Sequence, residues 1–283
     1  MIGRSGLTLA RAHVVMKTRL IRALTLACAA SAAQAQAAPT APSLFTRSDA
    51  IWSVAFLAGS IALSTADVRI TRTFTDSANH SSDLDKLSRN FAKIQEGTLT
   101  LGNLALWGIA RLVKAPAMAD ITFHAAESVV IGSVASQLIR GPLGRSRPYD
   151  SNFKDQYDFH PFQGFGNFKY RAFPSIHTAS SFAVATAYTL ETRRRAPGAT
   201  WIVAPIAYAL AAGPGIARLY TGQHWASDIV AGAFLGTLAG AKVVRYNHDV
   251  KPNNSVNRFF LGPQNLRLGV TQNGYSATYS RSF

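Results

Sequence analysis

Six apolar stretches, separated by shorter polar segments, dominate the pattern of this chain. Alanine, glycine, leucine and valine make up most of them, and they lack the strict apolar–polar alternation of a half-buried strand. We therefore predict an all-α fold, a helical bundle of about six core helices. The stretches lie at about residues 51–65, 98–113, 121–139, 178–190, 201–217 and 228–244.

Two further segments have patterns of their own. The polar segment between the first two apolar stretches holds a shorter amphipathic helix at about 83–94. Near the C-terminus, apolar and polar residues alternate on both sides of Gln272-Asn273-Gly274. Because Asn-Gly is a strong signal for a tight hairpin turn, we expect a small C-terminal β-hairpin within residues 251–283.

The N-terminal residues have the pattern of a secretory signal peptide. After Met16, basic residues precede a short alanine-rich apolar run that ends in Ala-Gln-Ala repeats near Ala35 and Ala37. We predict a cleaved signal peptide within residues 1–37, starting at Met16, with an uncleaved anchor helix as the alternative. The remaining domains are then expected as a linker with N-terminal helices over 38–97, a core over 98–250 and the hairpin extension over 251–283.

The charge of the chain is strongly basic, with 29 Lys and Arg residues against 14 Asp and Glu residues. This balance favours anionic partners, such as phosphorylated substrates or membrane surfaces. The run Arg193-Arg194-Arg195 is typical of a solvated loop or an anionic-lipid contact, so we expect no nucleic-acid partner. The single cysteine, Cys28, lies within the predicted signal peptide, so the exported chain has neither a disulfide nor a cysteine metal site.

The apolar stretches leave the relation to a membrane open. Each is shorter than, or barely equal to, the roughly 20 residues that cross a bilayer, and the mean hydropathy is only +0.08. Basic residues near the ends of several stretches nevertheless resemble a positive-inside pattern. We expect an exported, periplasmic protein that is soluble or membrane-associated, with a multi-pass inner-membrane protein as the alternative. The sequence says nothing about the oligomeric state.

Three short polar segments lie at the ends of the predicted helices. They read Arg-Gly-Pro-Leu-Gly-Arg-Ser-Arg-Pro, Phe-Pro-Ser-Ile-His and Arg-Leu-Tyr-Thr-Gly-Gln-His-Trp-Ala-Ser-Asp. In an antiparallel bundle with short turns, all three segments gather at one end. The polar residues that would meet there are Arg140, Arg147, Ser175, His177, Arg218, His224 and Asp228.

This set of residues suits phosphoryl transfer. Three converging arginines repel one another unless a multiply charged anion lies between them, and their planar forks match phosphate oxygens. Ser175 is a candidate N-cap, which would direct free backbone N–H groups at the same anion. Asp228 lies one helical turn after His224 and can orient its ring as a nucleophile, while His177 can protonate the leaving oxygen. No metal is required for this chemistry.

Each residue taken alone also has a purely structural interpretation. Arginines at helix ends often cap carbonyl groups, and a His–Asp pair one turn apart is commonly a surface ion pair. His124 and Glu127, three residues apart on one predicted helix, are expected to form such a structural pair in the core. The acids and the histidine between Asp150 and His160 fit no metal-ligand spacing. The presence of all three segments together, in this order, favours a phosphate-binding catalytic site over separate structural roles.

In that order, R-x6-R-P, P-S-x-H and R-x5-H-x3-D resemble the three-part signature of the type 2 phosphatidic acid phosphatase superfamily, which includes lipid phosphatases, bacterial acid phosphatases and vanadium haloperoxidases. The resemblance spans about residues 98–245. It implies that His224 attacks phosphorus, that Asp228 orients His224 and that His177 donates a proton. It also implies phosphate contacts from Arg140, Arg147, Ser175 and Arg218, and no cofactor.

The chain departs from the family signature at three positions. Arg140 replaces the usual lysine, Ile176 replaces the usual glycine between the serine and the histidine, and Ala217 replaces the usual serine before the arginine of the third motif. These changes bear on specificity and rate, because every charged and titratable group of the signature is present. A β-branched residue such as Ile176 disfavours a positive φ and can narrow the pocket.

The sequence therefore predicts a metal-independent phosphatase that acts on a lipid phosphate or another phosphomonoester or pyrophosphate through a phosphohistidine. A lipid substrate is favoured because the chain is basic and apolar. The alternatives are a soluble nonspecific acid phosphatase, a vanadate-dependent haloperoxidase with vanadate in the same pocket, and a non-catalytic phosphate- or lipid-binding relic.

Overall fold

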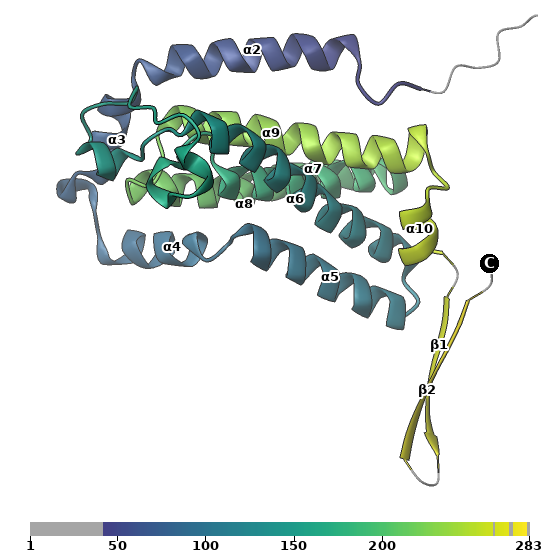
Figure 1. The fold of residues 1–283 in the computed structure, drawn as a ribbon. Coiled ribbons are helices and arrows are strands. Elements are labelled where there is room, and N and C mark those ends of the chain that lie inside the picture. Colours follow the sequence, from purple (N-terminus) through teal and green to yellow (C-terminus); the bar gives the residue numbers. More distant parts are fainter. Residues whose placement is uncertain (1–41, 263, 272–273, 282–283) are drawn as a thin grey trace, which may run out of the picture. The chain divides into compact units, whose positions relative to one another are not determined.

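The computed structural model describes residues 42–262, 264–271 and 274–281 (Figure 1). The predicted signal peptide over residues 1–37, with Cys28, therefore lies outside the described residues. The same is true of Gln272 and Asn273, the first two residues of the predicted hairpin turn.

The fold is helical, which confirms the all-α class. Each of the six apolar stretches forms a helix: α2 (Arg47–Ser64), α5 (Glu96–Leu112), α6 (Pro116–Leu143), α7 (Ile176–Arg195), α8 (Thr200–Tyr220) and α9 (Ala226–Arg245). The predicted amphipathic segment forms α4 (Ser82–Ala92), and two short helices were not predicted, α3 (Asp67–Thr75) and α10 (Ser255–Phe260). The described residues thus hold nine α-helices, so the expected bundle of about six was only approximate.

Helix α7 lies at the centre of the bundle and packs against α6, α8 and α9 (Figure 1). Glycines at four-residue spacing on α9 allow its backbone to approach α7 closely. A Cβ at Gly236 would lie 2.0 Å from the carbonyl oxygen of Ala179, and one at Gly232 would lie 2.4 Å from that of Ser175. Because no other residue type fits at these distances, the glycine spacing sets how α7 and α9 meet, and both helices begin at the predicted site.

The end of α6 is fixed by Gly144, which adopts a left-handed conformation with φ of 65° and donates its N–H to the Arg140 carbonyl. A Cβ on Gly144 would lie 1.7 Å from the carbonyl oxygen of His160, so only glycine fits there. The chain reverses at this point, and Arg145 and Arg147 follow directly in the loop that leads to α7.

The N-terminal helices also contribute to the core. Helix α2 packs along α9, and α3 follows it after a bend of 65°. This bend places Asp67, the first residue of α3, in a fully buried position beside α9. The N-terminal segment, expected from the sequence as a linker with helices, is thus part of the packed structure.

Two strands follow α10 along the chain, β1 (Gln264–Thr271) and β2 (Gly274–Arg281). They pair antiparallel, with Gln264 opposite Arg281 and Thr271 opposite Gly274. They form one two-stranded sheet.

The surface of the bundle exposes many large apolar side chains. Examples on four helices are Trp52 and Ile61 on α2, Leu101 and Ile109 on α5, Val134 and Leu138 on α6, and Trp201 and Leu210 on α8. Two helical stretches, Pro197–Tyr220 and Ala226–Val250, are long and apolar enough to cross a membrane, and the bent pair of α2 and α3 would be a third if it counts as one span. With 24 and 25 residues, these two stretches correct the expectation that every helix is barely long enough to span a bilayer.

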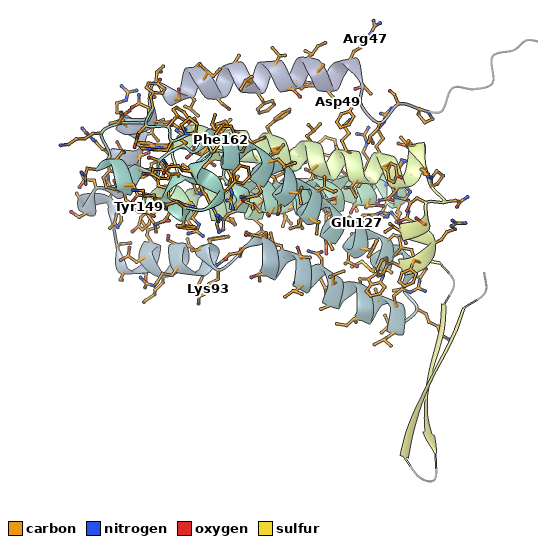
Figure 2. All side chains as sticks on the ribbon, in the orientation of Figure 1. Arg47, Asp49, Lys93, Glu127, Tyr149 and Phe162 are labelled. Carbon is orange, nitrogen blue, oxygen red and sulfur yellow. The ribbon has the colours of Figure 1, made fainter. Side chains whose placement is uncertain are left out.

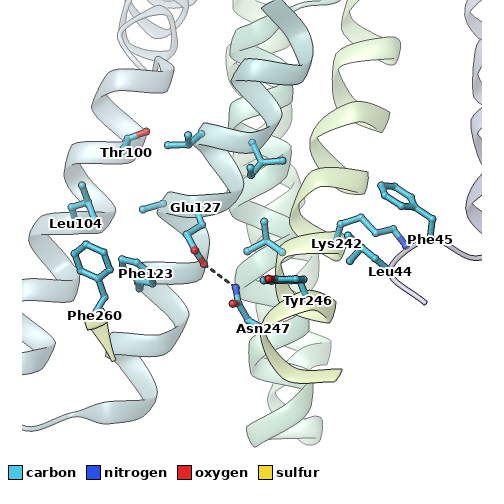
Figure 3. Close-up of a pocket in the computed structure, with 14 residues that line it drawn as sticks. Leu44, Phe45, Thr100, Leu104, Phe123, Glu127, Lys242, Tyr246, Asn247 and Phe260 are labelled. Carbon is cyan, nitrogen blue, oxygen red and sulfur yellow. Dashed lines mark hydrogen bonds between the residues drawn. The ribbon is translucent and has the colours of Figure 1, made fainter. Parts of the chain in front are cut away.

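An apolar groove of about 530 Å³ lies between α5, α6 and α9 (Figure 3). Phe123, Leu104 and Phe260 line one part of it, and Tyr246 lies across from them. Glu127 is the acidic residue in its wall, and the carboxylate accepts a hydrogen bond of 2.8 Å from the Asn247 amide. The predicted His124–Glu127 pair is therefore wrong: Glu127 bonds Asn247, and His124 bonds a different acid, Glu191.

Candidate active site

The structure brings the seven predicted site residues together at one end of the bundle. An Arg218 guanidinium nitrogen lies within hydrogen-bond distance of His177 Nε2, and the ring centres of His177 and His224 are 6.3 Å apart with an angle of 60° between their planes. The Ser175 N–H donates to the backbone carbonyl of Asp228, which joins the starts of α7 and α9. Tyr149 and Phe162 mark the loop between α6 and α7 at this end (Figure 2).

Arg140, Arg147 and Arg218 form a cationic cluster without a counter-ion. Arg147 is only 1% exposed and Arg140 only 8% exposed. Among the residues that the structure describes, no carboxylate lies within ion-pair distance of any of the three. Burial, together with the charges of Arg218 and Arg140, lowers the pKa of Arg147 to about 10. Buried charges are ordinarily paired, so this cluster is suited to an anion that the protein does not itself supply.

Neutral groups hold two of the arginines in place. Arg147 donates from Nε to the Phe168 carbonyl and from Nη1 to the Gln223 carbonyl, both at 3.1 Å, and its guanidinium lies 3.9 Å from the centre of the Phe168 ring. Arg140 donates from Nε to Gln137 Oε1 at 2.7 Å. The loop between α6 and α7, which carries Phe168, therefore supports Arg147 directly.

Several buried polar atoms at this end have no hydrogen-bond partner among the residues that the structure describes. They are Nδ1 of His177, Nε of Arg218, and both ring nitrogens of His224. Buried polar groups in folded proteins are nearly always hydrogen-bonded, and exceptions tend to lie where a ligand or a reaction uses them. Their concentration around the arginine cluster supports a binding site there.

Both histidines are held in the neutral form. Burial is the main cause that lowers the pKa of His177, to about 2, and Arg218 and His224 lower it further. Burial likewise lowers the pKa of His224 well below its usual value, and Arg147 and Arg218 act in the same direction. A neutral ring keeps a lone pair available for attack, and an anion among the arginines would offset the charges that oppose protonation.

Asp228 is the predicted orienting acid for His224, and its Oδ2 lies 3.5 Å from His224 Nδ1. This distance is longer than a hydrogen bond. The same oxygen accepts the Trp225 N–H at 2.8 Å, which caps the start of α9. The carboxylate is thus fixed mainly by other groups, and His224 lies beside it.

Two functional residues escaped the sequence analysis. Arg145 is 3% exposed and donates from Nη1 to Asp228 Oδ1 at 2.5 Å and from Nη2 to Asp67 Oδ2 at 2.8 Å. Asp67 also accepts from the backbone N–H of Ser227, at 2.9 Å. The proximity of Arg145 to Arg147 in the chain is a signal that could have drawn attention to it. Asp67 had no such signal, because it lies far from the three motifs.

The departures from the family signature have small structural consequences. Ser175 is the N-cap of α7, as predicted, and accepts from the Thr178 hydroxyl at 3.0 Å. Ile176 is the first residue of α7, has no positive φ and buries its side chain in the core. Isoleucine therefore imposes no backbone strain at the position where the family usually has glycine.

Comparisons with known proteins agree with the motifs. Residues 122–252 match the family model described as PAP2 superfamily. The lipid A 1-phosphatase of Porphyromonas gingivalis is 42% identical over 69 residues, which are 24% of this chain and 15% of that protein. The lipid A 1-phosphatase of Rhizobium etli is 31% identical over 109 residues, 38% of this chain and 43% of that protein. The chain thus spans less than half the length of these curated relatives.

A solved structure has a similar fold. It is the crystal structure of a transmembrane PAP2-type phosphatidylglycerolphosphate phosphatase from Bacillus subtilis, which aligns with 73% of this chain and 98% of that chain. The TM-score is 0.52 and the sequence identity 18%, so the likeness concerns the fold.

Proposed function

We propose that the protein is a phosphatase of the PAP2 superfamily, whose family model residues 122–252 match, and that it hydrolyses a lipid phosphate through a phosphohistidine on His224. One observation carries the proposal. Buried Arg140 and Arg147 and the half-buried Arg218 form no ion pair with a carboxylate of the described residues, and they converge on two neutral histidines whose ring nitrogens include unpartnered atoms. A phosphate group supplies both the negative charge and the hydrogen-bond acceptors that such a cluster lacks.

The chemistry follows from the positions of these groups. Arg140, Arg147 and Arg218 bind the non-bridging phosphate oxygens, and the charge that develops on those oxygens strengthens the contacts. Because Asp228 lies beside Nδ1 of His224, the Nε2 lone pair attacks phosphorus. The new N–P bond forms as the bond from phosphorus to the leaving oxygen breaks.

His177 then completes the cycle. Protonated when the phosphate is bound, it donates its proton to the leaving oxygen, so the product departs as a neutral alcohol or a phosphate. In the second half, His177 accepts a proton from a water molecule that attacks the phosphohistidine. The N–P bond breaks, inorganic phosphate leaves and His224 returns to its neutral form. Each step conserves charge without a metal or another cofactor.

The apolar surface favours a lipid as the substrate. Exposed aliphatic and aromatic side chains cover parts of α2, α5, α6 and α8, and two helical stretches have the length and composition of membrane spans. A phosphatase with such a surface meets its substrates at a bilayer. The names of the two bacterial relatives, lipid A 1-phosphatases, agree with a phosphorylated lipid of the cell envelope.

The test is phosphate release by the full chain in detergent micelles, with a phosphorylated lipid and a water-soluble phosphomonoester compared at equal concentration. We expect the wild type to prefer the lipid, and His224→Ala to lower kcat/KM by at least about 10³-fold, because the nucleophile is lost. Quenching in alkaline denaturant during turnover should trap a phosphate on the wild type that is stable to base and lost in acid, and none on His224→Ala.

A matched control is His160→Ala. His160 is a partly exposed loop histidine that pairs with Asp158, at 2.8 Å, rather than with the arginine cluster. We expect this variant to keep wild-type turnover. Hydrolysis that survives in His224→Ala would refute the phosphohistidine, and equal rates on the two substrates would refute the lipid preference.

A further inference from the structure

A second cluster of ionisable side chains lies near the opposite end of α7. Glu191 is 14 positions after His177 in the sequence, and a helix rises about 1.5 Å per residue, so roughly 20 Å separate the two along α7. Glu191 is fully buried, and His124 is 1% exposed. Both His124 Nδ1, at 2.5 Å, and His248 Nε2, at 2.8 Å, approach the same oxygen, Oε1 of Glu191. The three side chains come from α6, α7 and the π-helical turn that follows α9, Tyr246–Val250.

Two neighbouring residues, Asn257 and Arg195, orient the side chains of this cluster. His124 Nε2 faces Oδ1 of Asn257, on α10, at 3.3 Å, and an amide oxygen can only accept a hydrogen bond. The ring therefore carries its proton on Nε2, and the Nδ1 lone pair of the neutral ring points at the carboxylate. Two lone pairs at this separation repel each other unless a proton or a metal ion lies between them. The other carboxylate oxygen of Glu191, Oε2, is bonded by Arg195, which leaves Oε1 to face the two rings.

The side chains around the cluster include more carboxylates than guanidinium groups. Glu191, Glu127 and Asp120 contribute three carboxylates, and Arg195 contributes one guanidinium, which pairs with Asp120 as well as with Glu191. Glu127 bonds Asn247 and acts on His124 through its charge. Without the two rings, the three carboxylates outnumber the one guanidinium by two charges. Either a divalent cation or protons on the two rings balances this excess.

We propose that His124 Nδ1, Glu191 Oε1 and His248 Nε2 bind a Zn²⁺ ion that joins α6, α7 and the end of α9. Two imidazole nitrogens and one carboxylate oxygen are a donor set that zinc uses in proteins, and Asn257 would be the outer partner that orients His124. The three ligand atoms lie within 4.8 Å of one another. His248 is 26% exposed, so water can reach the fourth position.

The geometry needs only small movements. In a tetrahedral zinc site with bonds of about 2.0–2.1 Å, ligand atoms lie about 3.3 Å apart. Zinc binding therefore moves the two ring nitrogens away from Glu191 Oε1 by less than about 1 Å. The contact of His124 with Glu191 lengthens by about 0.8 Å, and that of His248, which lies in a π-helical turn and is partly exposed, by about 0.5 Å. The ion would be structural, because the cluster is far from the phosphate site.

The experiment measures metal bound by the full, tag-free chain purified in detergent, after equilibration with Zn²⁺ and removal of loosely bound metal. We expect one zinc per wild-type chain, and visible absorption bands of tetrahedral Co²⁺ when cobalt replaces zinc. His248→Gln should lose both signals and keep phosphate release. Asn257→Ala should weaken zinc affinity by about 10- to 100-fold, as expected for an outer partner of a ligand.

His224→Ala serves as the control, because it lacks the proposed nucleophile and should still bind one zinc. This separates the two proposals: loss of hydrolysis with zinc retained concerns the phosphate site, and loss of zinc with hydrolysis retained concerns the second cluster. A wild-type chain that binds no zinc would overturn the proposal and leave a cluster balanced by protons on its rings. One zinc bound equally by wild type and His248→Gln would overturn it as well.

Discussion

The two ends of α7 differ in how their buried charged side chains are paired. At the end that begins with Ser175, Arg140, Arg147 and Arg218 have no acidic partner within ion-pair distance in the described part of the chain, and His177 and His224 retain unpartnered ring nitrogens. At the other end, Glu191 lies within contact distance of His124, His248 and Arg195, and Arg195 bonds two carboxylates.

This difference separates a site adapted to an anion from a cluster in which acidic and basic side chains already meet. A protein that leaves several buried arginines unpaired loses stability unless a ligand compensates, so the unpaired end is the one adapted to an external anion. The same contrast appears within a few residues. Arg145 bonds Asp67 and Asp228, whereas Arg147 bonds only backbone carbonyls and an amide.

The largest expected effect is on catalysis, from Arg147→Met. Removal of this guanidinium should lower kcat/KM by about 10³- to 10⁵-fold, the range seen when an arginine that stabilises a phosphoryl-transfer transition state is lost. The measurement is phosphate release at saturating and limiting lipid substrate, with the thermal unfolding midpoint as a check on folding. Near-normal turnover would show that Arg147 does not contact the phosphate.

The matched change two residues away, Arg145→Met, should act first on stability. It leaves Asp67 and Asp228 buried without their shared cation, which typically costs 3–5 kcal/mol when one partner of a buried ion pair is removed. The thermal unfolding midpoint should fall by more than in Arg147→Met. Removal of the acid as well, in the double variant Asp67→Asn with Arg145→Met, should recover part of the loss, and simple additivity of the two losses would contradict the coupling.

The histidines of the phosphate end predict how stability depends on pH. Their pKa is lowered in the folded state, to about 2 for His177 and well below its usual value for His224. As the pH falls below about 6.5, the unfolded chain binds protons that the folded chain does not, so each histidine removes up to about 1.4 kcal/mol of stability per pH unit.

The variant His177→Gln tests this effect. It lacks one of the two groups, so its thermal unfolding midpoint should fall less steeply than that of the wild type between about pH 6.5 and pH 5. Inorganic phosphate should reduce the slope of the wild type, because a bound anion favours the protonated ring. Parallel curves for wild type and variant, with or without phosphate, would contradict a neutral His177.

The smallest expected effect is at the other end, from Arg195→Met. Its guanidinium is 25% exposed and pairs with Asp120 and Glu191. Because Glu191 keeps its two histidine contacts, we expect a loss of only about 1 kcal/mol and unchanged phosphate release. Thermal unfolding and the lipid phosphatase assay measure the two quantities, and a strong loss of activity would show that the two ends are not independent.

Local sequence was sufficient for the helices and for the motif residues. Alanine- and leucine-rich stretches form helices by short-range preference, so α2 and α5 to α9 appeared close to their predicted positions. The motif spacing also identified residues that meet at one end of the bundle, because short connections leave few other arrangements. Gly144 ends α6 and Ser175 caps the start of α7, and both residue types are local signals of helix ends. These helix ends position the motif residues.

Only the tertiary structure decided which charges are paired. Asp67 reaches Arg145 across 78 positions of the chain, and His124 reaches Glu191 across 67, whereas the pair that sequence spacing favoured, His124 with Glu127, does not form. Helical periodicity specifies which residues share a face, but long-range packing determines which faces meet. For this protein, the sequence determined the helices and the residues that phosphate chemistry requires, and the packing around α7 decided where buried arginines lie without acids and where a buried acid meets histidines and an arginine.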